Sequence, residues 1–93
     1  MEVADRIRRK LTEALTPSRL DVYDDSHRHV GHVGARPEGE THFTVEIVSD
    51  AFAGLTRLER HRLVHEVLAD ELAGPVHALS LKMLTTSEAN AAG

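Results

Sequence analysis

The sequence contains no cysteine, which excludes disulfide bonds, thiol catalysis and thiolate metal sites formed by this chain alone. Aromatic residues make up only 3% of the 93 residues. The core must therefore be built from Leu, Val, Ile and Ala, and a base-stacking platform of several rings for nucleic acid is excluded. No apolar run approaches the length of a membrane span or of a signal-peptide core. We therefore expect a cytoplasmic protein.

The charge balance gives no general attraction for nucleic acids or anionic lipids. The formal net charge is -4, so binding to phosphates would need a local basic patch acting against the overall field. With 41% hydrophobic and 28% charged residues, the composition is that of an ordinary folded domain. We expect a single domain over residues 1–93, because two separate cores would not fit in this length.

The N-terminal part of the chain predicts a helix, a short strand and a long loop. An amphipathic helix over residues 1–15, ended by Pro17, is predicted by four apolar residues spaced four apart: Val3, Ile7, Leu11 and Leu15. Alternation over residues 20–24 predicts a half-exposed strand. The glycines and the proline that follow predict a long, histidine-rich loop over residues 25–41.

The clearest strand pattern follows this loop. Residues 42–48 alternate strictly, and three apolar side chains share the face expected to be buried: Phe43, Val45 and Ile47. Ser49 and Asp50 break the strand and could cap a short helical turn around Phe52.

A capping-box pattern, Thr56-x-x-Glu59, opens a predicted long helix over residues 57–72, which Gly74 and Pro75 end. Its buried side is expected to consist of four apolar residues, Leu58, Val64, Leu68 and Leu72. Leu63 and Val67 are expected at the margins of this side.

Residues 76–83 predict a third strand, with His77 at the start of its apolar face. We expect the tail over residues 84–93 to fray, and one further helical turn is the alternative. A helix between the second and third strands lets them pair in parallel through a right-handed crossover. The first strand should pair antiparallel with the second. The sequence thus predicts an α+β fold with a three-stranded mixed sheet covered on one face by helices.

Motifs typical of enzymes are missing, among them Gly-x-Ser-x-Gly, the Walker loop, the dinucleotide fingerprint and His-Glu-x-x-His. No nucleophile, base and orienting partner are brought together by the local sequence, so we expect a protein that is not an enzyme.

The most distinctive candidates for a chemical role in this chain are its seven histidines. His27, His29 and His32 lie in the long loop, and a loop with glycines can orient two imidazoles toward one transition-metal ion. A solvated loop without a specific role explains the spacing equally well. His77 is either a ligand or a strand-boundary histidine that is hydrogen-bonded to the backbone.

We expect the remaining histidines to have supporting roles. His61 falls within the apolar stripe of the long helix in projection, so we expect a packed, hydrogen-bonded interior residue, with His65 at the border of that stripe. His42, on the polar face of its strand, is expected to tie down the end of the loop.

A basic patch could form from Arg57, Arg60 and Arg62, together with Lys82. Acidic residues on the same helical segment dilute it: Glu59, Glu66, Asp70 and Glu71. A solvated amphipathic helix explains these charges better than a nucleic-acid site does.

Four stretches, in this order and spacing, resemble the BolA family over nearly the whole chain: LDVYDDSHRH (20–29), GETHFTVEIVSDAFAG (39–54), RLERHRLVHEVLADEL (57–72) and GPVHALSL (74–81). The resemblance implies a class II KH-like fold with the order αββααβ. It also implies a role as partner of a monothiol glutaredoxin, in which the two proteins and glutathione share a 2Fe–2S cluster for cluster trafficking, maturation or iron sensing.

The family's invariant ligand is the histidine of its Val-His-Ala-Leu stretch, which corresponds to His77 here. The second ligand comes from the loop between the first two strands and follows Asp/Glu-Ser-x-x. That position corresponds to His29, with His32 in its Gly-His-Val-Gly setting as the stronger alternative and His27 as the other. Histidine ligation makes such a cluster sensitive to pH, because a protonated imidazole cannot bind iron.

Two other functions stay open. The family also implies DNA-binding transcriptional regulation for some members, here through Arg57, Arg60 and Arg62, although no Gly-x-x-Gly loop precedes the long helix. A stand-alone zinc or iron site formed by the loop histidines with His77 is the second alternative. We expect the isolated protein to be a monomer.

Overall fold

The computed structural model describes residues 2–25 and 41–92. Its elements follow in the order α1 (Glu2–Leu15), β1 (Arg19–Asp24), β2 (His42–Val48), the 3-10 turn η2 (Asp50–Phe52), α2 (Arg57–Val67), α3 (Ala69–Ala73), β3 (Ala78–Leu84) and α4 (Thr86–Ala92). Most of the predicted loop, residues 26–40, lies outside the described residues.

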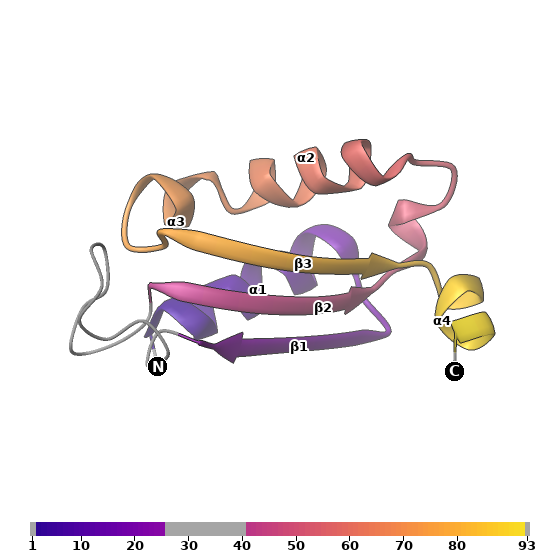
Figure 1. Cartoon of the computed structure of the whole chain (residues 1–93), viewed down its shortest axis with the longest axis horizontal. Coiled ribbons are helices and arrows are strands. Elements are labelled where there is room, and N and C mark those ends of the chain that lie inside the picture. The colour runs from indigo at the N-terminus through magenta and orange to yellow at the C-terminus, as the bar shows by residue number, and fades with distance from the viewer. Residues whose placement is uncertain (1, 26–40, 93) are drawn as a thin grey trace.

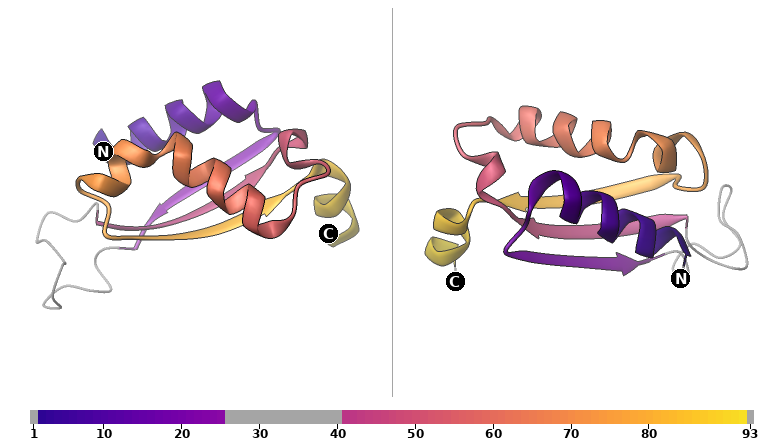
Figure 2. Two further views of the ribbon diagram at one scale, coloured as in Figure 1. Left: turned by 90° about the horizontal axis from the view of Figure 1, so that it is seen from above. Right: turned by 180° about the vertical axis from the view of Figure 1, so that it is seen from behind.

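The three strands form one mixed sheet in the order β1-β2-β3, as Figure 1 shows. β1 pairs antiparallel with β2, and β2 pairs parallel with β3. Helices α1 and α2 lie on the same side of the sheet (Figure 2). The predicted α+β fold, with a mixed sheet covered on one face, is therefore confirmed.

The core lies between the helices and the inner face of the sheet. Phe43, Val45 and Ile47 of β2 are each at most 2% exposed, so the alternation of this strand is confirmed. They join one cluster of buried residues with Ile7 and Leu11 of α1. The opposite face of β2 carries the half-buried polar side chains of His42, Thr44 and Glu46.

Two local signals at the ends of elements are confirmed. Pro17 follows α1, and Thr16, with φ 45°, makes the turn that leads the chain into β1. The buried Ser49 side chain accepts a hydrogen bond from the Ala51 N–H at the start of η2 and donates one to the Leu15 carbonyl. Ser49 therefore joins the end of α1 to the end of β2.

The predicted helix over residues 57–72 is interrupted, and this part of the prediction is wrong. α2 ends at Val67, Leu68 has φ -101° and ψ 21°, and α3 begins at Ala69. The bend turns Glu71, expected to be exposed, into the structure, where it is 2% exposed. Its carboxylate accepts a hydrogen bond from Lys10 Nζ of α1 at 3.0 Å. A helix-period pattern contains no signal for such a distant partner.

The buried side of α2 also differs from the prediction. Val64 and Leu68 are buried as expected, whereas Leu58 is 58% exposed and His61 is exposed instead of packed in the interior. Arg60 takes the inner position of the first turns. Its guanidinium donates to the carbonyls of Leu55 and Met83 and lies 5.8 Å from the centre of the Phe52 ring. A charged residue thus replaces the expected apolar ones, because its donors find part-buried backbone acceptors.

The C-terminal region is more ordered than the expectation of a frayed tail. The third strand runs over Ala78–Leu84, two residues later at its start than predicted, and α4 follows it directly. Thr85 and Glu88 cap α4 reciprocally, since the Thr85 N–H donates to the Glu88 carboxylate and the Glu88 N–H donates to Thr85 Oγ1. The helical alternative for the tail is therefore the correct one. No helix within residues 2–25 and 41–92 has the length and apolar character needed to cross a membrane.

Candidate functional site at the loop edge of the sheet

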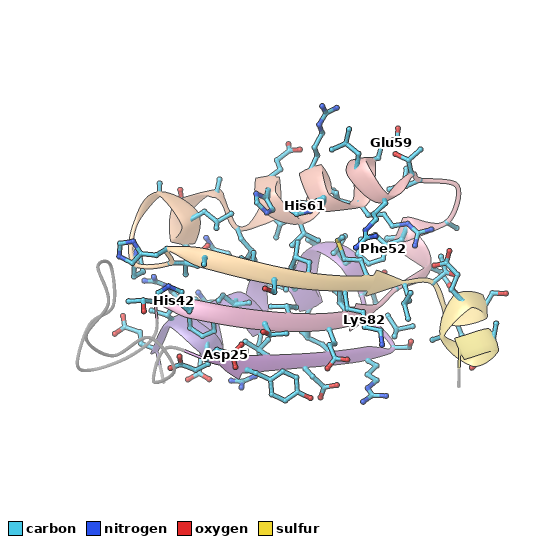
Figure 3. The ribbon with its side chains drawn as sticks, viewed as in Figure 1. Asp25, His42, Phe52, Glu59, His61 and Lys82 are labelled. Carbon is cyan, nitrogen blue, oxygen red and sulfur yellow. The ribbon has the colours of Figure 1, made fainter. Side chains whose placement is uncertain are left out.

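His42 and His77 lie side by side at the edge of the sheet where β2 and β3 begin. Their ring centroids are 6.3 Å apart and the ring planes meet at 26°. Asp25, the last described residue before the long loop, lies at the same end, as the labelled side chains in Figure 3 show. The register explains the arrangement, because the parallel pairing sets His42 opposite Ala78, and His77 directly precedes Ala78.

Backbone hydrogen bonds hold this edge in place. The fully buried Thr41 offers its carbonyl to the N–H of His77 at 2.7 Å and to that of Ala78 at 3.3 Å. The Asp25 N–H donates to the His42 carbonyl at 2.8 Å, and the Thr44 hydroxyl donates to the Asp25 carboxylate. Both residues that flank the long loop, positions 25 and 41, are thereby fixed beside the two histidines.

The two imidazoles differ in their surroundings. His77 is exposed, although its backbone is tied to a buried carbonyl. His42 is half-buried, and its Nδ1 lies 2.8 Å from the Thr41 hydroxyl. Of the two, His77 is therefore the imidazole that a molecule docking from outside can reach, while His42 is oriented by its neighbour.

Among the residues that the structure describes, no group of three or more His, Cys, Asp or Glu side chains could hold a metal ion. His27, His29 and His32 lie outside the described residues. A metal or cluster bound at His77 would thus need further ligands from the loop or from another molecule. His42, expected only to tie down the loop, is the neighbour of His77 that sequence reasoning underrated. Parallel pairing of the two strands was the signal that could have found it.

His61 lies on α2, away from the edge site (Figure 3). Its neighbour on the same helix is His65. The two Nε2 atoms are 2.7 Å apart, and the ring centroids are 4.2 Å apart. Burial and the charge of His61 lower the pKa of His65. These two histidines therefore form a separate pair, with no contact to His77 among those observed.

The predicted basic patch is divided. Arg57, Arg60 and Lys82 line one groove of about 490 Å³ between α2, β3 and α4, whereas Arg62 does not line it. Glu88 lies in the same groove and accepts two hydrogen bonds from the Arg60 guanidinium, at 2.6 and 3.1 Å. This pairing neutralises the most central cation of the patch, and it lowers the pKa of Glu88 to about 2.

Comparison with known proteins identifies the family. The family described as BolA-like protein matches residues 11–88. BolA-like protein 1 of Homo sapiens is 49% identical over 82 residues, which cover 88% of this chain and 57% of the relative. The SufE-like protein 1, chloroplastic/mitochondrial, of Arabidopsis thaliana is 47% identical over 87 residues, covering 89% of this chain and 24% of the relative. The chain therefore spans only part of these relatives.

Solved structures agree with these sequence matches. The BolA domain of SufE1 from Arabidopsis thaliana superposes with a TM-score of 0.83 at 47% identity, covering 91% of this chain and 93% of that one. The solution structure of BolA1 from Mus musculus gives a TM-score of 0.82 at 41% identity, covering 99% and 72%. Sequence and fold therefore agree over most of the chain, and the protein belongs to the BolA-like protein family.

Proposed function

We propose that this protein is a non-enzymatic, cytoplasmic partner of a monothiol glutaredoxin. In this role it lends histidine ligands to a 2Fe–2S cluster that it shares with the glutaredoxin and a glutathione, for cluster trafficking, maturation or iron sensing. The observation that carries the proposal is the placement of His77, exposed at the loop edge with its backbone fixed to the buried Thr41 carbonyl. Family membership supports the same role.

The donor set fits a shared cluster better than one held alone. The chain has no cysteine, so every thiolate must come from outside. His77 supplies one neutral imidazole, and the loop supplies the second, from His29 or from the alternative His32. When bound, the cluster supplies iron and sulfide that can pass to another protein. The fixed positions of Asp25 and Thr41 keep both ends of the loop beside His77. This reduces the conformational entropy that is lost when the loop ligand binds the iron.

The proposal is tested by co-expressing the chain with a monothiol glutaredoxin in the presence of glutathione and recording visible absorption and circular dichroism of the complex. His77→Ala should change the spectrum and weaken cluster retention. His61→Ala is the matched control, because it also removes an exposed histidine, but one that lies on α2 and not at the loop edge. A spectrum that His77→Ala leaves unchanged would contradict the assignment of the ligand. Comparison of His29→Ala with His32→Ala decides the loop ligand.

DNA binding is the second candidate, and the groove that contains Arg57 and Lys82 favours it. The Arg60–Glu88 pair and the acidic net charge weaken it. A DNA titration at two salt concentrations, with Arg57→Ala and Arg62→Ala, separates sequence-specific binding from a purely electrostatic contact. Metal analysis of the untagged protein alone tests the stand-alone metal site.

A further inference from the structure

A second pair of histidines lies on α2, outside the site at the loop edge. His61 and His65 are four residues apart, a spacing that sets two side chains on one face of a helix, one turn apart. Their Nε2 atoms are 2.7 Å apart, with ring planes tilted by 45°. At this distance one Nε2 must donate a proton and the other must accept it, so at least one ring is neutral with its lone pair directed at its neighbour. The two nitrogens therefore converge on one point.

This geometry is close to that of a metal chelate. Two imidazole nitrogens at about 2.0–2.1 Å from a tetrahedral ion stand about 3.3 Å apart, so the pair needs to open by only about 0.6 Å. Small changes of the side-chain torsions supply this movement, because His61 is exposed and His65 is only half-buried. The helix backbone does not have to move.

The first turns of α2 are fixed by contacts that do not involve the histidines. Thr56 and Glu59 form a complete capping box, with distances of 2.8 and 3.1 Å. Arg60, which precedes His61, is anchored to the Met83 carbonyl and to Glu88. The scaffold that carries the pair is therefore rigid, which reduces the entropy lost when a metal ion is bound.

We propose that His61 and His65 form a bidentate site for a divalent first-row transition-metal ion, such as Zn²⁺ or Cu²⁺, on the outer face of α2. Water fills the remaining coordination positions, since no group of three or more metal-binding side chains occurs among residues 2–25 and 41–92. Neutral imidazole is the ligand form that such ions bind.

The charged residues next to the histidine pair are of opposite sign, so one disfavours a bound cation and the other favours it. Arg62 follows His61, and Glu66 follows His65, and both side chains are exposed. Because both charges are exposed to water and opposite in sign, their effects on a bound cation are weak and partly cancel, so the two coordinating nitrogens dominate the affinity. The site is independent of the proposed cluster function, because neither His61 nor His65 lies at the loop edge.

The experiment is a titration of the full chain with Zn²⁺. Calorimetry measures the binding, and NMR records the imidazole ¹⁵N resonances of the individual histidines. The resonances of His61 and His65 should shift together in the wild type. His61→Ala or His65→Ala should each abolish the shift of the remaining partner and weaken this binding event about 100-fold, because a single imidazole lacks the chelate advantage.

Two controls separate this site from other histidines and from loss of structure. The double variant His65→Ala/Glu66→His keeps the number of histidines but moves one to another helix face, and it should lose the site while far-ultraviolet circular dichroism stays unchanged. His77→Ala should leave the shifts of His61 and His65 intact. The proposal is overturned when Zn²⁺ leaves both resonances in place in the wild type, or when the relocated histidine binds as tightly as the native pair.

Discussion

The orientation of α2 makes a quantitative prediction, because two leucines in the same region have opposite environments. Leu68 is 1% exposed and belongs to the core cluster with Ile7, Leu11 and Val64. Leu58 is 58% exposed on the first turn. The same substitution at both positions, Leu68→Ala and Leu58→Ala, therefore compares a buried with an exposed leucine while the chemical change stays constant.

The expected cost of Leu68→Ala is about 2–5 kcal/mol of unfolding free energy, the range for a buried leucine. The Leu68 N–H donates to the Val64 carbonyl, and the Leu68 carbonyl accepts from the Leu72 N–H. These two bonds keep the backbone from collapsing into the space left by the side chain, which favours the upper part of the range. Leu58→Ala should change the free energy by less than about 0.5 kcal/mol, since Leu and Ala have similar helix propensities and Leu58, 58% exposed, loses little buried apolar area.

Urea denaturation followed by circular dichroism measures both effects. Leu68→Ala should lower the midpoint strongly at an unchanged slope, and it should lower the melting temperature by at least about 8 °C. Leu58→Ala should superpose on the wild type. Equal losses for the two variants would refute the reasoning, because they would place Leu58 on the buried side of the helix, as the sequence pattern alone suggests.

Three further predictions follow from polar contacts. The pKa of Glu88 is lowered to about 2 from a reference value of 4.5, so its pairing with Arg60 and Thr85 stabilises the fold above about pH 4.5 and is lost as the pH falls toward 2. Acid titration of Glu88→Gln should therefore show a shallower loss of stability over this interval than the wild type, and parallel curves would contradict the assignment. Glu71→Gln should lower the urea midpoint clearly more than Asp70→Asn, because the Glu71 side chain is 3% exposed and the Asp70 side chain is 92% exposed, although both contact Lys10; similar effects would show that burial of Glu71 does not matter. The amide of His77 should exchange slowly with solvent despite its exposed side chain, since it donates to the buried Thr41 carbonyl at 2.7 Å; fast exchange measured by NMR would remove the backbone support of the candidate site.

The parts of the fold that sequence reasoning predicted correctly depend on local chemistry. The alternation over His42–Val48 gives the correct bounds of β2, and the reciprocal hydrogen bonds of Thr56 and Glu59 form as their spacing predicts. Ser49 caps η2 for the same reason, because its acceptor and its N–H partner are only two residues apart. Short-range hydrogen bonds and period-two patterns can be recognised without the rest of the chain.

The errors have distant causes. Arg60 turns inward because its acceptors at Met83 and Glu88 lie 23 and 28 residues away, which no window along α2 reveals. Glu71 is buried because its partner Lys10 is 61 residues away. Both cases place a charged side chain on the inner side of the helical segment, where the periodic pattern predicts apolar residues. The exposure of Leu58 and His61 is the direct consequence of the inward position of Arg60.

The candidate site was partly accessible from sequence. His77 was singled out through the family resemblance, but its neighbour His42 follows only from the parallel register, in which His42 stands opposite Ala78. The helical projection predicts His61 in the interior, and it therefore does not predict the exposed His61–His65 pair. Once Arg60 takes the inner position, the residue that follows it in the helix must turn outward.

The two histidine pairs have different geometries, and this difference assigns them different chemistry. The centroids of the His42 and His77 rings are 6.3 Å apart, and the ring planes meet at 26°. The Nε2 atoms of His61 and His65 are much closer to each other, at 2.7 Å. The edge pair therefore needs a ligand from the loop or from a partner, whereas the helix pair needs only the ion. A metal titration of the isolated chain consequently reports first on α2, and spectra that depend on glutaredoxin and glutathione report on His77.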